Sequence, residues 1–444
     1  MNSKSFLQLV AWFTAVFLLA GCDLLPVSES PAVETAVSSP ATPDADGTPS
    51  VVNTPSFEIP EPTPEAQSSL IIWLPPAIAS RTEAGAVVFS DQLLAFNTIY
   101  PDLIISVEQK SAGGQGGILN YLRTGQNVAP SILPDLIALP VDQLTAVAEE
   151  GLIYPLEDVL DPALVADLYP AAQTWTSFND HFIAYPFAIT ELPHLEFSPS
   201  LTGTVPLQWS NFITDTDQTM VFPATGTAGA KLALQFYLQA GGSLTNEAGQ
   251  PILELEPLTL ALQQLNDGRE NGFILQQSSN LSTLDESRLL SQNGAASYAL
   301  SASDEYLMGR TEELAAGFAA IPGLETPLPP LVRGWAWVIT TPDPAEKAIA
   351  AELITLLTDP EQLGNWSLNS RILPANPEAF AQWPADDDYV PFIRRELDRA
   401  EPMPLVDTSP TMKALKDAVF DVISLTRSPA DAAADAVNSL QPQP

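Results

Sequence analysis

Short apolar runs alternate with amphipathic segments over residues 70–150. Runs of strand length are separated by segments in which apolar residues recur at helical spacing. The predicted strands cover 70–74, 103–107 and 135–139, and the predicted helices cover 84–97, 113–122 and 141–150. This alternation, in steps of roughly thirty residues, predicts a parallel sheet with right-handed crossover connections.

The remainder of the chain is also α/β, with a less regular order between Ala184 and Gly323. One later strand is predicted at 334–340, with Trp335, Trp337 and Ile339 on one face because side chains alternate along a strand. Further helices are predicted at 229–240, 258–271, 344–357, 412–424 and 429–440.

A short apolar stretch opens the chain and ends at its only cysteine, Cys22. Lys4 and the apolar residues 6–20 have the charge and length of a secretory signal, too short for an ordinary membrane span. The run Leu19-Ala20-Gly21-Cys22 resembles the lipobox of bacterial lipoproteins. The resemblance implies that residues 1–21 are a signal peptide and that Cys22 is lipidated, with palmitate among its acyl chains. A plain secretory signal with an incidental cysteine, or an uncleaved anchor, is the alternative.

The segment 22–68 has the composition of an extended tether. Nine prolines fall between Pro26 and Pro64, and no Lys or Arg occurs from Ser5 to Ser80. Such a segment buries too little apolar surface to offset the entropy of ordering it. In polyproline-like form it could hold a globular body on the order of 100 Å from a membrane. A spacer of no particular length is the alternative.

The formal charge of −37, from 54 acidic and 17 basic residues, argues against a nucleic-acid partner. The two histidines, His181 and His194, lack the spacing of metal ligands, and no catalytic motif is present. We therefore predict no cofactor, no metal and no enzymatic activity.

Several segments, in order, are similar to the extracellular solute-binding proteins of ABC importers, in particular the sugar-binding branch. These segments include Phe96 to Val107, Pro134 to Leu160, Ala184-Tyr185-Pro186, Pro206 to Phe212, Arg333 to Thr340, Ala350 to Pro360 and Ile372-Leu373-Pro374. The resemblance covers nearly everything from Ser69 to Leu440.

The resemblance implies a two-lobed, periplasmic-binding-protein-like (type II) α/β fold, with mixed sheets flanked by helices and a ligand cleft between the lobes. Crossings are expected near Tyr185-Pro186, Leu331-Val332 and Ser370-Arg371. Lobe one would then hold 69–185 plus 332–370, and lobe two would hold 186–331 plus 371–444.

A sugar site needs flat apolar faces for the ring and rigid polar groups for the hydroxyls. The candidate ligand contacts are Trp73, Gln115, Trp175, Phe187, Glu191, Trp335 and Arg371. Trp73 ends the first strand, where open α/β sheets present ligands. The alternative for the aromatic candidates is packing in the core. The alternative for Glu191 is that it is an exposed acid in a loop. For Arg333 and Arg371 an interlobe salt bridge is the favoured role.

The expected function is that of a monomeric, lipid-anchored extracellular receptor, which captures a small carbohydrate by lobe closure and delivers it to an ABC permease. A tethered polysaccharide-active enzyme is one alternative. A sensory or scaffold lipoprotein is another, because the aromatic-asparagine stretch common in the family is replaced by Leu195-Glu196-Phe197-Ser198.

Overall fold

A computed structural model describes residues 68–128, 132–198, 201, 204–215, 217–310 and 316–441. The predicted signal peptide, Cys22 and all but the last residue of the predicted tether lie outside these residues. All described residues fall within one compact unit, 64–444.

The first sheet begins with the parallel strands that the alternating pattern predicts. Strand β1 (Ser69–Leu74) pairs in parallel with β2 (Ile104–Gln109) on one side and with β3 (Leu136–Pro140) on the other. The connecting helices are α2 (Glu83–Ile99) and α3 (Ile118–Val128), and α4 (Leu144–Glu149) follows β3. The parallel sheet with helical connections is confirmed.

Later strands extend this sheet on its other side and make it mixed. Strand β11 (Leu331–Ile339) runs antiparallel to β3 and to β6 (Tyr185–Thr190), and β6 pairs with β12 (Leu373–Pro374). The short strand β13 (Glu401–Pro402) pairs with the start of β11. The order is therefore β12-β6-β11-β3-β1-β2, with β13 beside β11.

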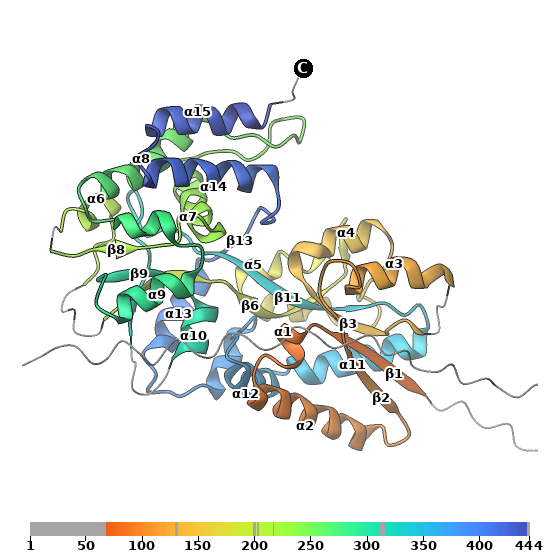
Figure 1. Ribbon diagram of the computed structural model, residues 1–444. Coiled ribbons are helices and arrows are strands. Elements are labelled where there is room, and N and C mark those ends of the chain that lie inside the picture. Colours follow the sequence, from red (N-terminus) through yellow and green to blue (C-terminus); the bar gives the residue numbers. More distant parts are fainter. Residues whose placement is uncertain are drawn as a thin grey trace, which may run out of the picture. The chain divides into compact units, whose positions relative to one another are not determined.

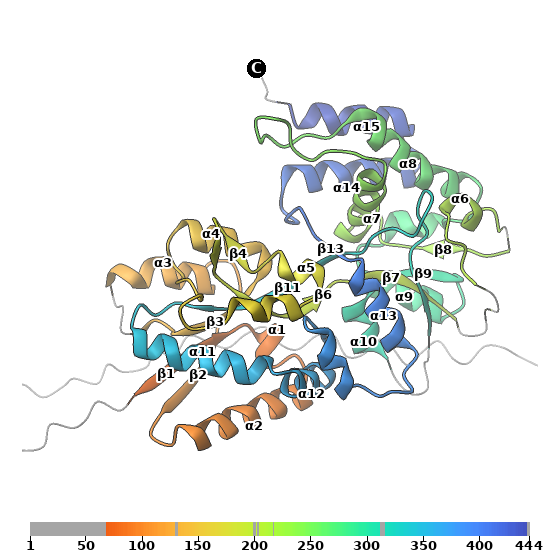
Figure 2. The same cartoon turned by 180° about the vertical axis from the view of Figure 1, so that it is seen from behind.

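Both faces of this sheet are covered, as Figures 1 and 2 show from opposite sides. One face packs against α2, α11 (Pro344–Thr358) and α12 (Pro360–Ser370). The other face packs against α3 and α4. Alternate residues of β1 divide between these two layers, which explains why its sequence is apolar throughout.

A smaller sheet has the order β10-β7-β9-β8. Its strands are β7 (Pro193–Phe197), β8 (Met220–Val221), β9 (Tyr298–Ala302) and β10 (Gly317–Ala319). The helices that form a core with this sheet are α7 (Thr227–Gln239), α8 (Leu255–Glu270), α14 (Pro410–Ile423) and α15 (Pro429–Ser439). Helix α9 (Leu284–Gln292) also contacts β9.

The remaining elements are short, apart from one amphipathic helix. They are α1 (Pro76–Ala79), η2 (Val141–Gln143), η3 (Pro162–Asp167), α5 (Pro170–Gln173), β4 (Ser177–Phe178), β5 (His181–Phe182), α6 (Trp209–Phe212), η4 (Gln276–Asn280), α10 (Ser303–Gly309), η5 (Pro377–Gln382) and α13 (Tyr389–Asp398).

Strand pairing fixes where the chain passes from one sheet to the other. All of β6 lies in the larger sheet, so the first passage follows Thr190, five residues beyond the expected boundary at Tyr185. Strand β12 also belongs to the larger sheet, although it follows the expected boundary at Ser370. The division of the chain into lobes stays a prediction, and strand pairing places both β6 and β12 in the larger sheet.

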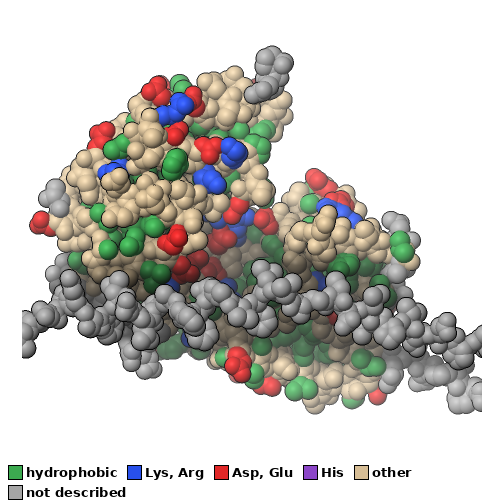
Figure 3. All heavy atoms as spheres, in the orientation of Figure 1, with side chains coloured by type: hydrophobic (Ala, Val, Ile, Leu, Met, Phe, Trp, Pro, Cys, Tyr) green, Lys and Arg blue, Asp and Glu red, His purple; other side chains and the backbone are tan. Residues whose placement is uncertain are grey.

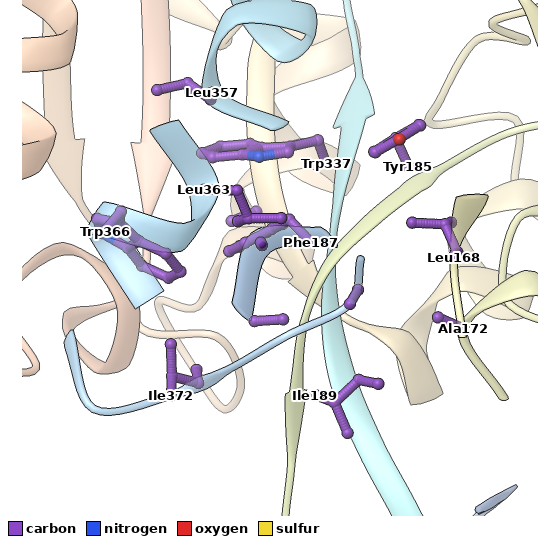
Figure 4. Packing of buried hydrophobic residues seen from close by; sticks show 14 of the residues in the cluster. Leu168, Ala172, Tyr185, Phe187, Ile189, Trp337, Leu357, Leu363, Trp366 and Ile372 are labelled. Carbon is purple, nitrogen blue, oxygen red and sulfur yellow. The ribbon is translucent and has the colours of Figure 1, made fainter. Parts of the chain in front are cut away.

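An aromatic stack fixes β11, β6 and α12 to one another. The rings of Phe187 and Trp337 stack with centroids 4.8 Å apart, and Trp366 meets Phe187 edge-on at 5.6 Å (Figure 4). All three residues are buried. The shared-face prediction for β11 is confirmed, since Trp335, Trp337 and Ile339 contact one core cluster while Ala336 and Val338 contact another.

Candidate functional site

Two adjoining cavities lie where elements of the two sheets meet. The larger has a volume of about 550 Å³ and is lined from both sides, by Pro140 and Trp335 of the larger sheet and by Asp304 and Asp407. The smaller, of about 270 Å³, lies against the smaller sheet and α7. Glu191, Glu305 and Asp407 line both cavities, so the two form one continuous candidate site.

Several charged residues of the site directly follow strands. Asp142 follows β3, Glu191 follows β6, and the pair Asp304 and Glu305 opens α10 immediately after β9. Open α/β sheets characteristically bind ligands beyond the carboxyl ends of their strands, where side chains from separate segments converge. The site occupies that position.

Arg333 on β11 joins carboxylates from distant parts of the chain. Its guanidinium contacts Asp142 at 2.7 Å and Asp407 at 2.7 Å, and it donates to the carbonyl oxygen of Leu405 at 2.8 Å. Asp142 follows a strand of the larger sheet, whereas Asp407 precedes α14 in the core of the smaller one. The salt-bridge role predicted for Arg333 is therefore present between the two regions.

Two more cationic side chains are paired in the same site. Lys231 on α7 lies 2.6 Å from Glu191 and 3.4 Å from Asp407. Arg81, between α1 and α2, lies 2.7 Å from Asp304. In Figure 3 acidic and basic side chains gather in the hollow between the two parts of the surface.

Glu191 has an unusual backbone conformation. Its φ of 59° lies in the left-handed region, which a non-glycine residue adopts at a cost of order 1 kcal/mol. Its backbone N–H donates to Asp304 at 2.5 Å, and its carboxylate lies 3.4 Å from Arg333. These contacts hold the strained turn at the point where Glu191 lines both cavities.

The two carboxyls on α10 have raised pKa values for the same main reason. Burial raises the pKa of Asp304, and the charge of Arg81 opposes that shift. Burial, followed by the neighbouring charge of Asp304, raises the pKa of Glu305 to about 7. One carboxylate oxygen of Glu305 is buried without a hydrogen-bond partner. Removing a carboxylate from water without pairing it costs stability.

Trp335 supplies the aromatic surface of the larger cavity. It is partly buried on β11, beside Gly334 in the same wall. Trp175 packs against Gly334 so closely that an added Cβ there would lie 2.6 Å from its ring. Of the seven predicted contacts, Glu191 and Trp335 line the cavities directly, and Trp175 supports the wall.

The other four predicted contacts lie elsewhere among the described residues. Trp73 is 4% exposed in the core beneath α3, with Lys110 over its ring at 5.2 Å. Phe187 is held in the aromatic stack with Trp337. Gln115 is exposed in the loop before α3. Arg371 caps α12 at φ 54° and donates to the carbonyl oxygen of Met308 at 3.0 Å. Their roles as ligand contacts stay predictions.

Sequence reasoning missed Arg81, Asp142, Lys231, Asp304, Glu305 and Asp407. A usable signal existed for Asp142, which lies three residues beyond the predicted strand 135–139. The strand-end rule, applied to polar residues as it was to Trp73, selects it. Asp304 and Glu305 also follow a strand within three residues, but that strand, β9, is not among the predicted ones. No local pattern marks Arg81, Lys231 or Asp407.

Two sheets with covering helices, joined by several passages of the chain and enclosing a site at their strand ends, define the two-lobed solute-binding protein fold. The predicted fold class is therefore confirmed.

Solved structures of this fold are similar to the chain over most of its length. The maltose-binding periplasmic protein of Listeria monocytogenes, in complex with maltose, matches with a TM-score of 0.67 and 15% identity, over 85% of this chain and 97% of that one. The maltose-bound MalE3 of T. maritima matches with a TM-score of 0.63 and 17% identity, over 84% of this chain and 99% of that one. The GacH receptor of Streptomyces glaucescens, also determined with acarbose, matches with a TM-score of 0.59 and 16% identity, over 84% of this chain and 97% of that one. At these identities the likeness establishes the fold.

No protein-family model and no curated protein sequence matches the chain. Within the described part of the chain, none of the helices has both the length and the apolar character needed to cross a membrane. The described residues also contain no group of three or more His, Cys, Asp or Glu side chains placed to hold a metal ion.

Proposed function

We propose that the chain is an extracytoplasmic solute receptor that captures a small solute, a sugar or oligosaccharide, and delivers it to an ABC permease. The observation that carries this proposal is the continuous site at the strand ends, lined by residues from both sheets. The fold likeness supports it, because the similar structures include proteins with bound maltose.

The proposed binding step uses an aromatic face and fixed polar groups. Trp335 would pack against the apolar face of a sugar ring, and Glu191 would accept hydrogen bonds from its hydroxyls. A ligand that contacts residues from both sheets favours the arrangement in which they are close together. The closed form would then dock on the permease.

A thermal-shift screen of mono- and oligosaccharides, amino acids and polyamines tests the capture step. Sugars are expected to raise the melting temperature, and small-angle scattering should show a decrease in the radius of gyration with the same ligand. Trp335→Ala should weaken binding at least tenfold, while the exposed Glu247→Gln should bind as the unaltered protein does. Absence of both responses for every sugar would contradict the proposal.

We further propose that Cys22 is lipidated and holds the receptor at the membrane beside its permease. Anchoring raises the local concentration of the receptor at the permease without any new contact between the two proteins. Expressed in a bacterium that processes lipoproteins, the full chain should fractionate with membranes, and Cys22→Ser should appear in the soluble fraction with ligand affinity unchanged. A variant that stays with the membrane would exclude the lipid anchor.

A further inference from the structure

The charges that line the site do not balance. Its carboxylates outnumber its cationic side chains by five to three. The carboxylates are Asp142, Glu191, Asp304, Glu305 and Asp407, and the cations are Arg81, Lys231 and Arg333. The site is therefore negative whether Glu305 is ionised or protonated.

All three cations are already engaged by carboxylates. Arg81 pairs with Asp304, Lys231 pairs with Glu191, and Arg333 contacts Asp142 and Asp407. Four of the five carboxylates are thus paired within the site. A solute that arrives with a negative charge would have to displace one of these pairs and face the remaining acids.

Glu305 is the one of these five carboxylates that has no cationic partner in the site. No ion pair within the described residues neutralises it. Its carboxylate accepts a hydrogen bond from its own backbone N–H, and one of its oxygens is buried without a partner. The largest charge effects on it come from carboxylates: Asp304 beside it, Asp285 on α9, and Glu191 across the site. The cations that line the two cavities beside it, Lys231 in one and Arg333 in the other, are bound to other acids.

The general acidity of the chain does not account for this arrangement. An exposed carboxylate is solvated by water and has little cost, whereas Glu305 is partly buried and gains only its own backbone N–H as a partner. Carboxyls with strongly shifted pKa values cluster at binding sites, and Glu305 lines both cavities of this site.

We infer that the solute is a hydroxylated amine, an amino sugar or an amino-substituted oligosaccharide, whose ammonium group neutralises Glu305. The inference rests on the proposed function and specifies its substrate class. A positive group placed in the shared part of the site interacts favourably with Glu305, Asp304 and Glu191 together, at low effective dielectric. A neutral sugar of the same shape leaves Glu305 uncompensated.

Isothermal titration at pH 7 with three β-1,4-linked disaccharides tests the inference. The disaccharide of glucosamine carries amines at C2, cellobiose carries hydroxyls there, and the N-acetylated disaccharide carries amides. We expect the amine to bind at least tenfold more tightly than either neutral compound. Glu305→Gln should remove that preference, and the exposed Glu247→Gln should retain it.

Proton release gives a second readout. Burial raises the pKa of Glu305 to about 7, so this carboxyl is partly protonated near neutral pH, and a bound ammonium would displace that proton. Because the amines of the sugar also titrate near neutral pH, the comparison is made with Glu305→Gln. Titrations in buffers of different ionisation enthalpy should show that the unaltered protein releases more protons on binding the amine than this variant does, and that cellobiose releases none.

The outcomes separate this inference from the proposed function. Equal or tighter binding of cellobiose, with a decrease in the radius of gyration, would overturn the amine preference and leave a receptor for neutral sugars. An amine preference that survives in Glu305→Gln would also overturn it. Binding of putrescine as tightly as the amino disaccharide would remove the requirement for hydroxyls. If no saccharide binds, the inference and the proposed function fall together.

Discussion

Two carboxyls in different regions both have raised pKa values because they are removed from water, but they differ in their hydrogen-bond partners. Asp135, at the entrance to β3, has its pKa raised to about 6 by burial, and Glu305, in the candidate site, has its pKa raised to about 7 by burial. Asp135 accepts a hydrogen bond from the backbone N–H of Ile71 at 2.7 Å, whereas one oxygen of Glu305 has no partner.

The surroundings of Asp135 explain why it is kept. Its own N–H donates to the carbonyl oxygen of Ile71 at 2.8 Å, and its carbonyl oxygen accepts from Thr340 at 2.9 Å. The residue therefore joins β1 to the segment after β11 and continues the strand pairing. The Glu305 carboxylate accepts a hydrogen bond only from its own backbone N–H and joins no second segment of the chain. The contrast gives Asp135 a structural role and agrees with the ligand contact proposed for Glu305.

The largest expected effect comes from removing the charge of Glu305. The pKa of Glu305 in the folded protein, about 7, exceeds its ordinary value of 4.5, so its ionisation opposes folding increasingly as the pH rises between these values. Glu305→Gln should therefore stabilise the protein by about 2–3 kcal/mol at pH 8 and by almost nothing at pH 4.5. Urea denaturation at the two pH values measures this. A variant no more stable at pH 8 would mean that Glu305 has a partner in the folded protein.

A smaller effect, with the opposite dependence on pH, is expected from His194. This residue is fully buried among the rings of Tyr306, Tyr389 and Phe392, and burial lowers its pKa to about 4. The unfolded chain takes up a proton near pH 6.5 while the folded protein does not, so His194 reduces stability as the pH falls from 6.5 to 4.

At pH 5 this loss should amount to about 2 kcal/mol relative to pH 8. His194→Leu should lack this component, which is measured as the difference between the pH profiles of the two proteins. Parallel profiles would show that burial does not lower the pKa of His194 in the folded protein.

The smallest effect separates the two roles of Asp135. Asp135→Asn keeps an acceptor for the N–H of Ile71, and Asp135→Ala removes it. We expect Asp135→Ala to be less stable than Asp135→Asn by about 1 kcal/mol at any pH, because both variants lack the charge and differ in the hydrogen bond. Thermal denaturation compares the two. Equal stabilities would show that the hydrogen bond from Ile71 to the Asp135 carboxylate does not stabilise the fold.

Local patterns in the sequence sufficed for most of the fold. Apolar runs identified β1, β2 and β3, and helical spacing identified α2, α7, α8 and α11, because each pattern is completed within about fifteen residues. Helices α12 and α13 were not predicted. Helix α12 follows α11 after a single residue, Asp359, which caps it and ends α11, so the two were not separated.

The candidate site was largely beyond local patterns. Arg81 and Asp304 are 223 residues apart in the chain, and Arg333 and Asp142 are 191 apart. Such pairs depend on which strands become neighbours in the sheets, and the order β6-β11-β3 brings together residues that no spacing relates. Glu191 and Trp335 were found because each lies at the end of a recognisable strand or crossing segment.

The pairing of Arg333 has a consequence for the medium in which the protein works. Its carboxylate partners, Asp142 and Asp407, are partly open to water, so dissolved ions compete for both. Dissolved ions would likewise screen the ammonium group of a bound solute from Glu305. Rising ionic strength would then weaken both solute binding and the ion pairs that Arg333 makes with Asp142 and Asp407. An increase in salt alone would therefore promote release of the solute.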